Sequence, residues 1–285
     1  MIAPRHTSSS ATPDWIEIVN TGTTAVNLAG WSLSNDGNPR KFVFPNPTSL
    51  PAGGYLLVFC DSQTNAPGLH TRFFLSGHGE QLFLYDAQTH RVDAVSFGSQ
   101  VPDLSLGRFG GAWQLTQPTP RGPNQLAEVG PSGYLVINEW LANSALGQSD
   151  WLEIFNPSGL PAVLRGLYLG TSNEFFQITS LSFAPPGGYV QLFADEAPGP
   201  NHLDFKLPAE GNTISLYDFF GTEINRVNYG AQLDGVSEGR YPDGTVNIVG
   251  FPGSASPGTT NFVVSFVGPR INELMARNDS AVVNP

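Results

Sequence analysis

The strongest constraint on the fold of this chain is an internal repeat. The segment DWIEIVN at residues 14–20 returns as DWLEIFN at residues 150–156. Further matches follow both segments in the same order, as expected when a structural unit is duplicated and insertions fall in its loops. The chain is therefore expected to contain two homologous domains.

Four more motifs recur after each of these segments. They are LAGWSL at 28–33 and LRGLYL at 164–169, PAGGY at 51–55 and PPGGY at 185–189, LYD at 84–86 and 216–218, and SLGR at 105–108 and SEGR at 237–240. The segment INEW at 137–140 precedes the second copy and recurs as INEL at 271–274, whereas no INE segment precedes Asp14. The sequence is therefore expected to be part of a longer tandem array.

These repeats predict the domain boundaries. The first domain is expected over residues 1–125, with an incomplete first strand. A linker follows over 126–133, and the second domain over 134–262. Residues 263–285 are expected to hold a linker and the truncated start of a third repeat.

Composition and local patterns both favour strands over helices. The chain contains 32 Gly and 24 Pro, which disfavour helix interiors, and only 13% of its residues are charged. Short runs of β-branched and aromatic residues, bounded by Gly, Pro, Asn or Asp, occur throughout both copies. Several such strands in each copy predict an all-β protein made of two tandem, antiparallel, immunoglobulin-like β-sandwiches.

The same sequence argues against several classes of function. The net charge is −11 and the only lysines are Lys41 and Lys206, so no basic cluster is present to bind nucleic acid. The longest apolar run, residues 55–60, is too short to cross a membrane. Cys60 is the single cysteine, which excludes an intramolecular disulfide, and its place near a strand end predicts a small buried thiol. We find no nucleophile elbow, phosphate-binding loop or dinucleotide-binding motif.

The recurring motifs, taken together and in this order, resemble those of the lamin tail domain in its tandem bacterial form. This resemblance implies an immunoglobulin-like sandwich and a non-enzymatic role in interaction or spacing. In bacteria such domains are attached to secreted or surface proteins, sometimes beside nuclease or kinase-like domains. The chain has neither heptads nor a basic patch, so filament formation and chromatin binding are not carried over from the nuclear lamins.

Two structural ion pairs are predicted from matched charges. In an extended strand Glu17 shares a face with Trp15, and a carboxylate buried on an aromatic face needs a partner. Arg108 and Arg240 are the only arginines at matched positions in the two repeats. We therefore expect Glu17 to pair with Arg108, and Glu153 with Arg240.

Metal binding is not expected for the histidines and is a weak alternative for one acidic stretch. The histidines follow no short metal-binding spacing and are expected to be solvated loop residues: His70, His78, His90 and His202. A Gly-rich stretch offers a calcium candidate in Asp234, Glu238 and Asp243, although it lacks the spacing of an EF-hand loop. No cofactor is expected.

Tryptophans divide into predicted core residues and predicted binding residues. Trp15 and Trp151 recur in the repeat, and Trp140 corresponds to Leu274, so these three are expected in the cores. Trp31 and Trp113 have no aromatic counterpart in the other copy, and Phe109 lies close to Trp113 in the sequence. Aromatic side chains outside a shared core commonly form protein- or sugar-binding patches, so Trp113, Phe109 and Trp31 are the binding candidates.

The sequence thus favours a non-enzymatic spacer or adhesion module of a larger secreted or surface-attached bacterial protein, located outside the cell. One alternative is a carbohydrate- or matrix-binding sandwich, with or without calcium. Another is an accessory domain of a multidomain extracellular enzyme. The unfinished third repeat also predicts strand exchange within or between chains, because a lone strand can complete an open sheet edge.

Overall fold

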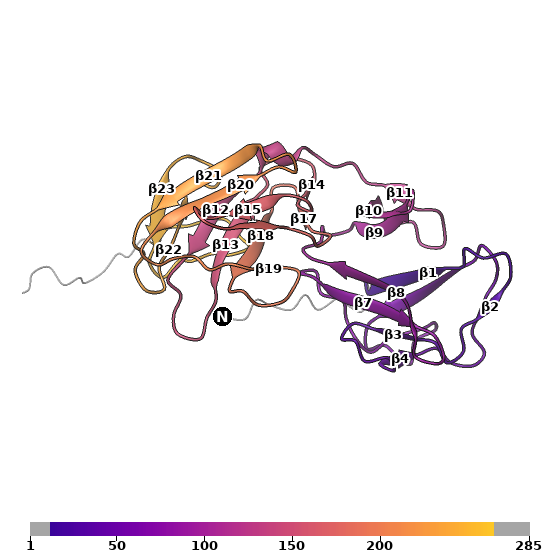
Figure 1. The fold of residues 1–285 in the computed structure, drawn as a ribbon. Helices are drawn as coiled ribbons and strands as arrows, with labels where there is room; N and C mark the ends of the chain where they lie inside the picture. The colour runs from indigo at the N-terminus through magenta and orange to yellow at the C-terminus, as the bar shows by residue number, and fades with distance from the viewer. Residues whose placement is uncertain (1–11, 265–285) are drawn as a thin grey trace, which may run out of the picture.

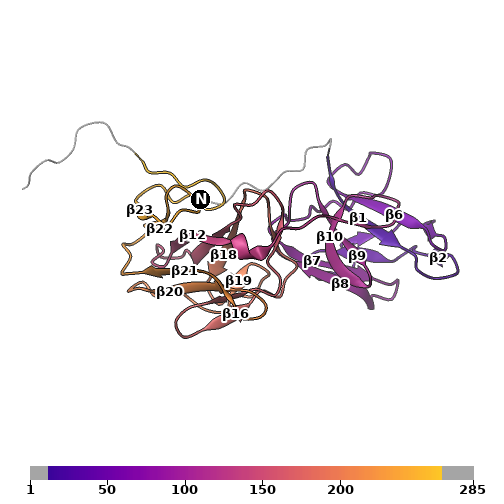
Figure 2. The same cartoon turned by 90° about the horizontal axis from the view of Figure 1, so that it is seen from above.

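The computed structural model describes residues 12–264, and these residues form two adjacent β-rich halves (Figures 1 and 2). Apart from one 3-10 turn at Ser132–Tyr134, all regular elements of the described residues are strands. Nearly all strand pairs are antiparallel, which confirms the predicted all-β, immunoglobulin-like class.

The first half contains four sheets. A two-stranded sheet pairs β1 (Asp14–Val19) with β6 (Tyr55–Cys60), and a second pairs β2 (Val26–Asn27) with β5 (Ser49–Leu50). A four-stranded sheet has the order β4-β3-β7-β8, with bounds Phe42–Val43, Ser32–Ser34, Glu80–Tyr85 and Arg91–Phe97. A three-stranded sheet has the order β11-β10-β9, with bounds Gln125–Leu126, Ala112–Gln117 and Ser105–Phe109.

A six-stranded sheet dominates the second half. Its order is β19-β18-β13-β12-β22-β23, with bounds His202–Leu203, Tyr189–Ala194, Asp150–Phe155, Val136–Leu141, Ser237–Arg240 and Ile248–Phe251. The opposing sheet has the order β16-β15-β20-β21, with bounds Phe175–Gln177, Tyr168–Gly170, Asn212–Tyr217 and Glu223–Tyr229. The short strands β14 (Ala162–Val163) and β17 (Phe183–Ala184) form a separate pair.

Apolar side chains fill the space between the sheets of each half. The first core includes Ile16, Leu33, Phe44 and Val58, which are almost fully buried. The second core is larger and is built around fully buried residues such as Trp140, Leu152, Ile154 and Phe205. Trp151 is also buried, so Trp140 and Trp151 are core residues as predicted, whereas Trp15 is only half-buried.

The recurring motifs pair in the same register in both halves. In the first, Asp14 lies opposite Cys60 and Val19 opposite Tyr55. In the second, residues 150–155 of β13 face β18 in the same way, from Asp150 opposite Ala194 to Phe155 opposite Tyr189. The hairpins β7–β8 and β20–β21 also carry an irregularity at the same point, before Tyr85 and before Tyr217. The matched sequence segments thus have matched strand geometry.

One strand distinguishes the two halves. In the second half β12 lies between β13 and β22 and pairs with both, which joins them into one sheet. Among the described residues of the first half, no strand lies between β1 and β9, which correspond to β13 and β22. The sheet β1–β6 and the sheet β9–β11 therefore remain separate.

The two halves meet in a packed contact. Gly98 N–H donates to the carbonyl of Leu181 at 3.2 Å, and Phe183 N–H donates to the carbonyl of Ser99 at 2.8 Å. A buried apolar cluster joins residues of both halves, namely Phe97, Val101, Leu115, Leu181 and Phe183, with Trp113 and Ala127 packed against it. We call this contact, including its hydrogen bonds, the seam.

Candidate functional site

The most unusual chemistry of the described residues is a group of buried carboxylates in the second half. Glu153 on β13 is fully buried, and it accepts hydrogen bonds from Asn138 Nδ2 at 3.2 Å and from the Gly258 N–H at 2.5 Å. Arg240 instead donates to the carbonyls of Ile137 and Thr245, at 2.7 and 2.6 Å. The predicted Glu153–Arg240 ion pair is therefore wrong, because a backbone N–H and an amide satisfy the carboxylate.

The corresponding prediction for the first half is also wrong. Glu17 accepts a hydrogen bond from the Arg121 N–H at 2.6 Å, whereas Arg108 forms an ion pair with Asp93 at 2.8 Å. The Arg108 guanidinium also lies over the Trp113 ring, 4.6 Å from its centre. Arg121 and Gly258 occupy matched positions in the loops that close the two halves. Both glutamates therefore hold a closing loop through its backbone.

Glu139 on β12 is a second buried carboxylate, directly opposite Glu153. It accepts hydrogen bonds from Ser237 Oγ at 2.6 Å and from the N–H and Oγ of Ser256, both at 3.2 Å. Burial raises the pKa of Glu139 despite these hydrogen bonds. The recurring INE segment contains this residue, but its spacing gave no indication that the carboxylate would be buried.

The pKa of Glu153 is also raised, to about 8. Burial is the main cause, because removal from water disfavours the charged form, and the nearby Glu139 and Asp243 carboxylates add to it. Hydrogen bonds from Gly258 and Asn138 lower the pKa by a smaller amount. Every group around Glu153 named here is tied to strand or loop packing, so the arrangement is structural.

The predicted calcium candidate is not assembled. Asp234 is exposed, whereas Asp243 accepts hydrogen bonds from Asn138 Nδ2, the Asn261 N–H and the Tyr189 hydroxyl, the last at 2.8 Å. Glu238 lies on β22. No group of three or more His, Cys, Asp or Glu side chains within residues 12–264 is arranged to hold a metal ion.

Two of the four histidines considered above, His70 and His202, are not solvated loop residues, contrary to prediction. His70 Nδ1 lies 2.7 Å from Asp61 Oδ1, and His202 Nδ1 lies 2.8 Å from Asp195 Oδ1. The two rings also pack 5.3 Å from those of Phe59 and Phe193, respectively. The His–Asp pairs thus hold equivalent loops against equivalent strands, whereas His78 and His90 are exposed as predicted.

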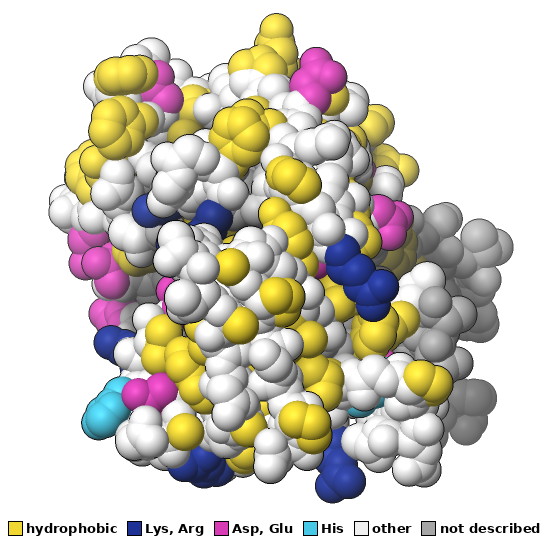
Figure 3. Space-filling model, turned by 90° about the vertical axis from the view of Figure 1, so that its right-hand side faces the viewer, with side chains coloured by type: hydrophobic (Ala, Val, Ile, Leu, Met, Phe, Trp, Pro, Cys, Tyr) yellow, Lys and Arg dark blue, Asp and Glu magenta, His cyan; other side chains and the backbone are white. Residues whose placement is uncertain are grey.

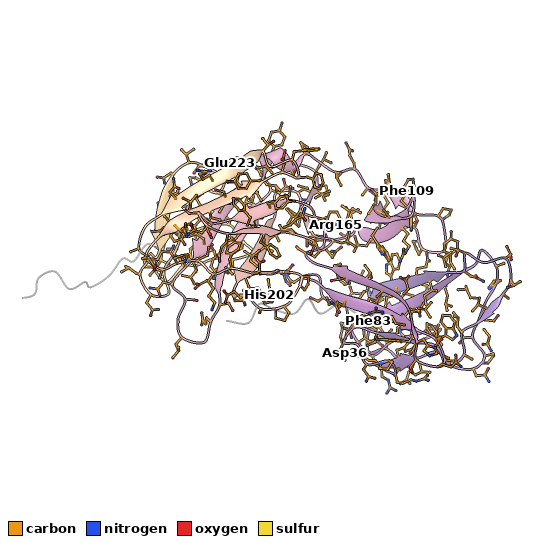
Figure 4. The ribbon with its side chains drawn as sticks, viewed as in Figure 1. Asp36, Phe83, Phe109, Arg165, His202 and Glu223 are labelled. Carbon is orange, nitrogen blue, oxygen red and sulfur yellow. The ribbon has the colours of Figure 1, made fainter. Side chains whose placement is uncertain are left out.

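The structure separates the three predicted binding aromatics. Trp31 packs against the first core, and Trp113 is half-buried against the seam. Phe109 alone is exposed, with 43% of its surface accessible, and Figure 4 shows it on β9. These residues do not form one patch.

A more prominent aromatic group lies on the second half and was missed by the sequence reasoning. Phe219 and Phe220 occupy the turn between β20 and β21, are 64% and 88% exposed, and have ring centres 5.4 Å apart. Phe175, 63% exposed, packs against Tyr217, the last residue of β20 before this turn. We call these four residues the aromatic tip. The sequence did contain a sign of this group: two adjacent Phe residues occupy a turn where the first copy has Ala87 and Gln88.

Charge is sparse on the surface. In Figure 3 the Lys and Arg side chains of the first-half face stand apart, among apolar and uncharged polar groups. No helix within the described residues is long and apolar enough to span a membrane.

Fold and site together define an immunoglobulin-like β-sandwich protein whose buried polar groups serve packing. The model of one family, the lamin tail domain, matches residues 2–99, so this part of the chain is similar to that family. That family is an immunoglobulin-like, non-catalytic interaction domain. No curated protein and no solved structure matches the chain.

Proposed function

We propose that this chain is a non-enzymatic spacer and interaction module of a larger secreted or surface-attached bacterial protein. In this proposal residues 1–125 and 134–262 are tandem lamin tail domains that are held in a fixed relative orientation. The observation that carries the proposal is the seam, since a spacer must transmit position from one end to the other.

The seam has the features of a permanent contact. Gln100 Nε2 donates to the carbonyl of Leu181 at 2.8 Å, which adds a side-chain hydrogen bond to the two backbone ones. Gly98 lies so close to the second half that a Cβ atom there would overlap Ser182 Oγ. Gly130 also pairs with Ala162, so the predicted linker is held along the second half. These contacts favour a stiff pair of domains.

Small-angle X-ray scattering of the full chain tests this role. We expect the wild-type profile, extrapolated to zero protein concentration so that it reports single chains, to fit one rigid arrangement. Leu181→Asp should increase the radius of gyration by placing an unpaired charge in the seam. Leu146→Asp is the matched control, because Leu146 is fully exposed at 106%. Circular dichroism establishes that each variant remains folded, and Gln100→Ala provides a milder change to the same contact. A wild-type profile that requires independently moving halves would contradict the spacer role.

The aromatic tip supports a second candidate function, the binding of a polysaccharide or a protein. Exposed aromatic rings clustered on one turn are typical of binding surfaces, since they offer large apolar area at low entropic cost. Calorimetric titration with a panel of polysaccharides tests this candidate. Binding that is lost in Phe220→Ala but kept in Val246→Ala, a change at another exposed apolar residue, would support it. The absence of heat with every polysaccharide would argue against this ligand class.

A further inference from the structure

In the second half, four side chains hold β12 in place. The first half has a counterpart of each of these side chains, but no strand within residues 12–264 takes the place of β12 there. β12 is anchored at two points. Glu139 is bound by Ser237 and Ser256, while Ile137 is bound by Asn225 and Arg240. The matched residues of the first half are Ser105, Thr119, Asp93 and Arg108. Ser105 and Arg108 match through the SLGR and SEGR motifs, Asp93 through the hairpin register, and Thr119 through the loop that ends in Asn124 and Asn261.

The first anchoring point keeps both of its hydroxyl side chains in the first half, although Ser105 Oγ there lies 2.9 Å from Thr116 Oγ1. Ser256 Oγ donates to Glu139 Oε2 at 3.2 Å in the second half. The matched atom, Thr119 Oγ1, is buried and has no hydrogen-bond partner within residues 12–264. A buried hydroxyl without a partner is uncommon and costly, which indicates that an acceptor belongs beside it.

The second anchoring point is also preserved. In the second half Asn225 Oδ1 accepts from the Ile137 N–H at 3.1 Å and from Arg240 Nη2 at 3.2 Å. In the first half Asp93 and Arg108 form the contact that corresponds to Asn225–Arg240, at 2.8 Å. About half of each side chain is exposed. The Asp93 carboxylate can therefore accept a hydrogen bond from the backbone of a strand at this point, and the Arg108 guanidinium can donate one to the same backbone.

The face that such a strand would cover is less completely buried in the first half than in the second. Trp151 and Glu153 are buried, whereas the matched Trp15 and Glu17 are only half-buried. Gly107, where Asn124 and Thr116 of the first half already leave no room for a Cβ atom, corresponds to Gly239 on β22. At its counterpart Gly239, a Cβ atom would come within 2.5 Å of the Asn138 carbonyl on β12.

We propose that the space between β1 and β9 is a strand-acceptor site, and that it takes residues 271–276 of a second copy of this chain. These residues read INELMA, against INEWLA at 137–142, and thus repeat Ile, Asn, Glu and the final Ala of the segment that contains β12. By the register of β12, Glu273 lies opposite Glu17 on one side and Gly107 on the other. Its carboxylate then accepts hydrogen bonds from Ser105 and Thr119.

A second copy supplies the strand because of where the described chain ends. Figures 1 and 2 place that end beside β22 and β23, at the opposite end of the molecule from β1. The donated strand and the strand-acceptor site are then different surfaces of one chain. Each added copy therefore leaves one strand and one site free, so the contact repeats head to tail and gives open-ended assemblies. This inference goes beyond the proposed spacer function, which stands or falls on the seam within one chain.

Sedimentation velocity over a range of protein concentrations tests the assembly. We expect the full chain to form dimers and longer species, and Leu274→Pro to remain monomeric because proline removes a ladder hydrogen bond. Ala281→Pro, outside the INELMA segment, is the control and should assemble like the wild type. Wild-type chain that stays monomeric at all concentrations, or assembly unaffected by Leu274→Pro, would overturn the proposal.

A peptide of residues 269–278 added to the Leu274→Pro chain tests the site itself. We expect one peptide to bind per chain, and a peptide carrying Glu273→Ala to bind at least about tenfold more weakly, since it lacks a charge-assisted hydrogen bond. Thr119→Val in the acceptor should weaken binding to a similar extent. Its melting temperature without peptide should not fall, because the lost hydroxyl has no partner there. Failure of the peptide to bind, including failure because residues 1–11 fill the site, would refute the inference.

Discussion

Glu139 and Glu153 face each other across β12 and β13, and both side chains are fully buried. Each is satisfied by neutral donors from the loop that closes the second half, Ser256 for Glu139 and Gly258 for Glu153. Two carboxylates so close in a dry environment cannot both ionise cheaply, because each destabilises the charge of the other. The central sheet of this half is therefore sensitive to pH.

The first prediction is that the second half is more stable in mild acid than in weak base. The pKa of Glu153 is raised from 4.5 to about 8 in the folded state. Its stabilising contribution is therefore fully present below about pH 4.5 and is lost as the pH rises through about 8. Glu153→Gln should weaken this dependence of stability on pH. The free energy of unfolding of the variant, compared with that of the wild type, should therefore rise between pH 5 and pH 8.

Urea denaturation at several pH values, followed by circular dichroism, measures this difference. Glu210→Gln is the matched control, because Glu210 is exposed. The control curve should run parallel to that of the wild type. If Glu153→Gln also ran parallel to the wild type, the buried carboxylate would not be the source of the dependence.

Much of the fold could be predicted from the sequence because the repeat itself carries positional information. Residues that match in two copies must occupy similar places, and alternation within DWIEIVN assigns them to a strand. The common register of β1–β6 and β13–β18 follows from these two facts. The contact between the halves could not be predicted in this way, because Phe97 and Leu181 belong to no shared motif.

The polar partners were less predictable for a physical reason. A search of side chains finds charged partners, but Glu17 and Glu153 are bound by the backbone N–H groups of Arg121 and Gly258. Every residue except proline has such a donor, so the sequence carries no sign of which one a carboxylate meets. Arg108 instead pairs with Asp93 of β8, a strand that belongs to a different sheet from β9.

A second prediction concerns the asparagine that ends each DWxEIxN motif. Asn156 Nδ2 donates to the carbonyls of Leu160 and Ala184, at 2.8 and 3.1 Å, and the side chain is fully buried. Asn156→Ala leaves both carbonyls without this donor and should cost about 1–3 kcal/mol of unfolding free energy. Asn173→Ala, at an exposed position, should change stability by less than about 0.5 kcal/mol. Chemical denaturation of both variants measures the difference, and equal stabilities would contradict the structural role of Asn156.

The last prediction uses the single thiol to follow one half of the molecule. Cys60 is fully buried on β6, and burial raises the pKa of its thiol, so little reactive thiolate is available in the folded state. A thiol reagent should therefore modify Cys60 only when the β1–β6 sheet opens, and the rate should rise with urea in step with loss of the first half. Glu153→Gln and Asn156→Ala, both in the second half, should change this rate less than Asn20→Ala, since Asn20 Nδ2 donates to the carbonyls of Thr24 and Leu50 beside that sheet. Rapid modification of the native chain would show that the first core is open, and equal rates in all three variants would show that the halves unfold as one unit.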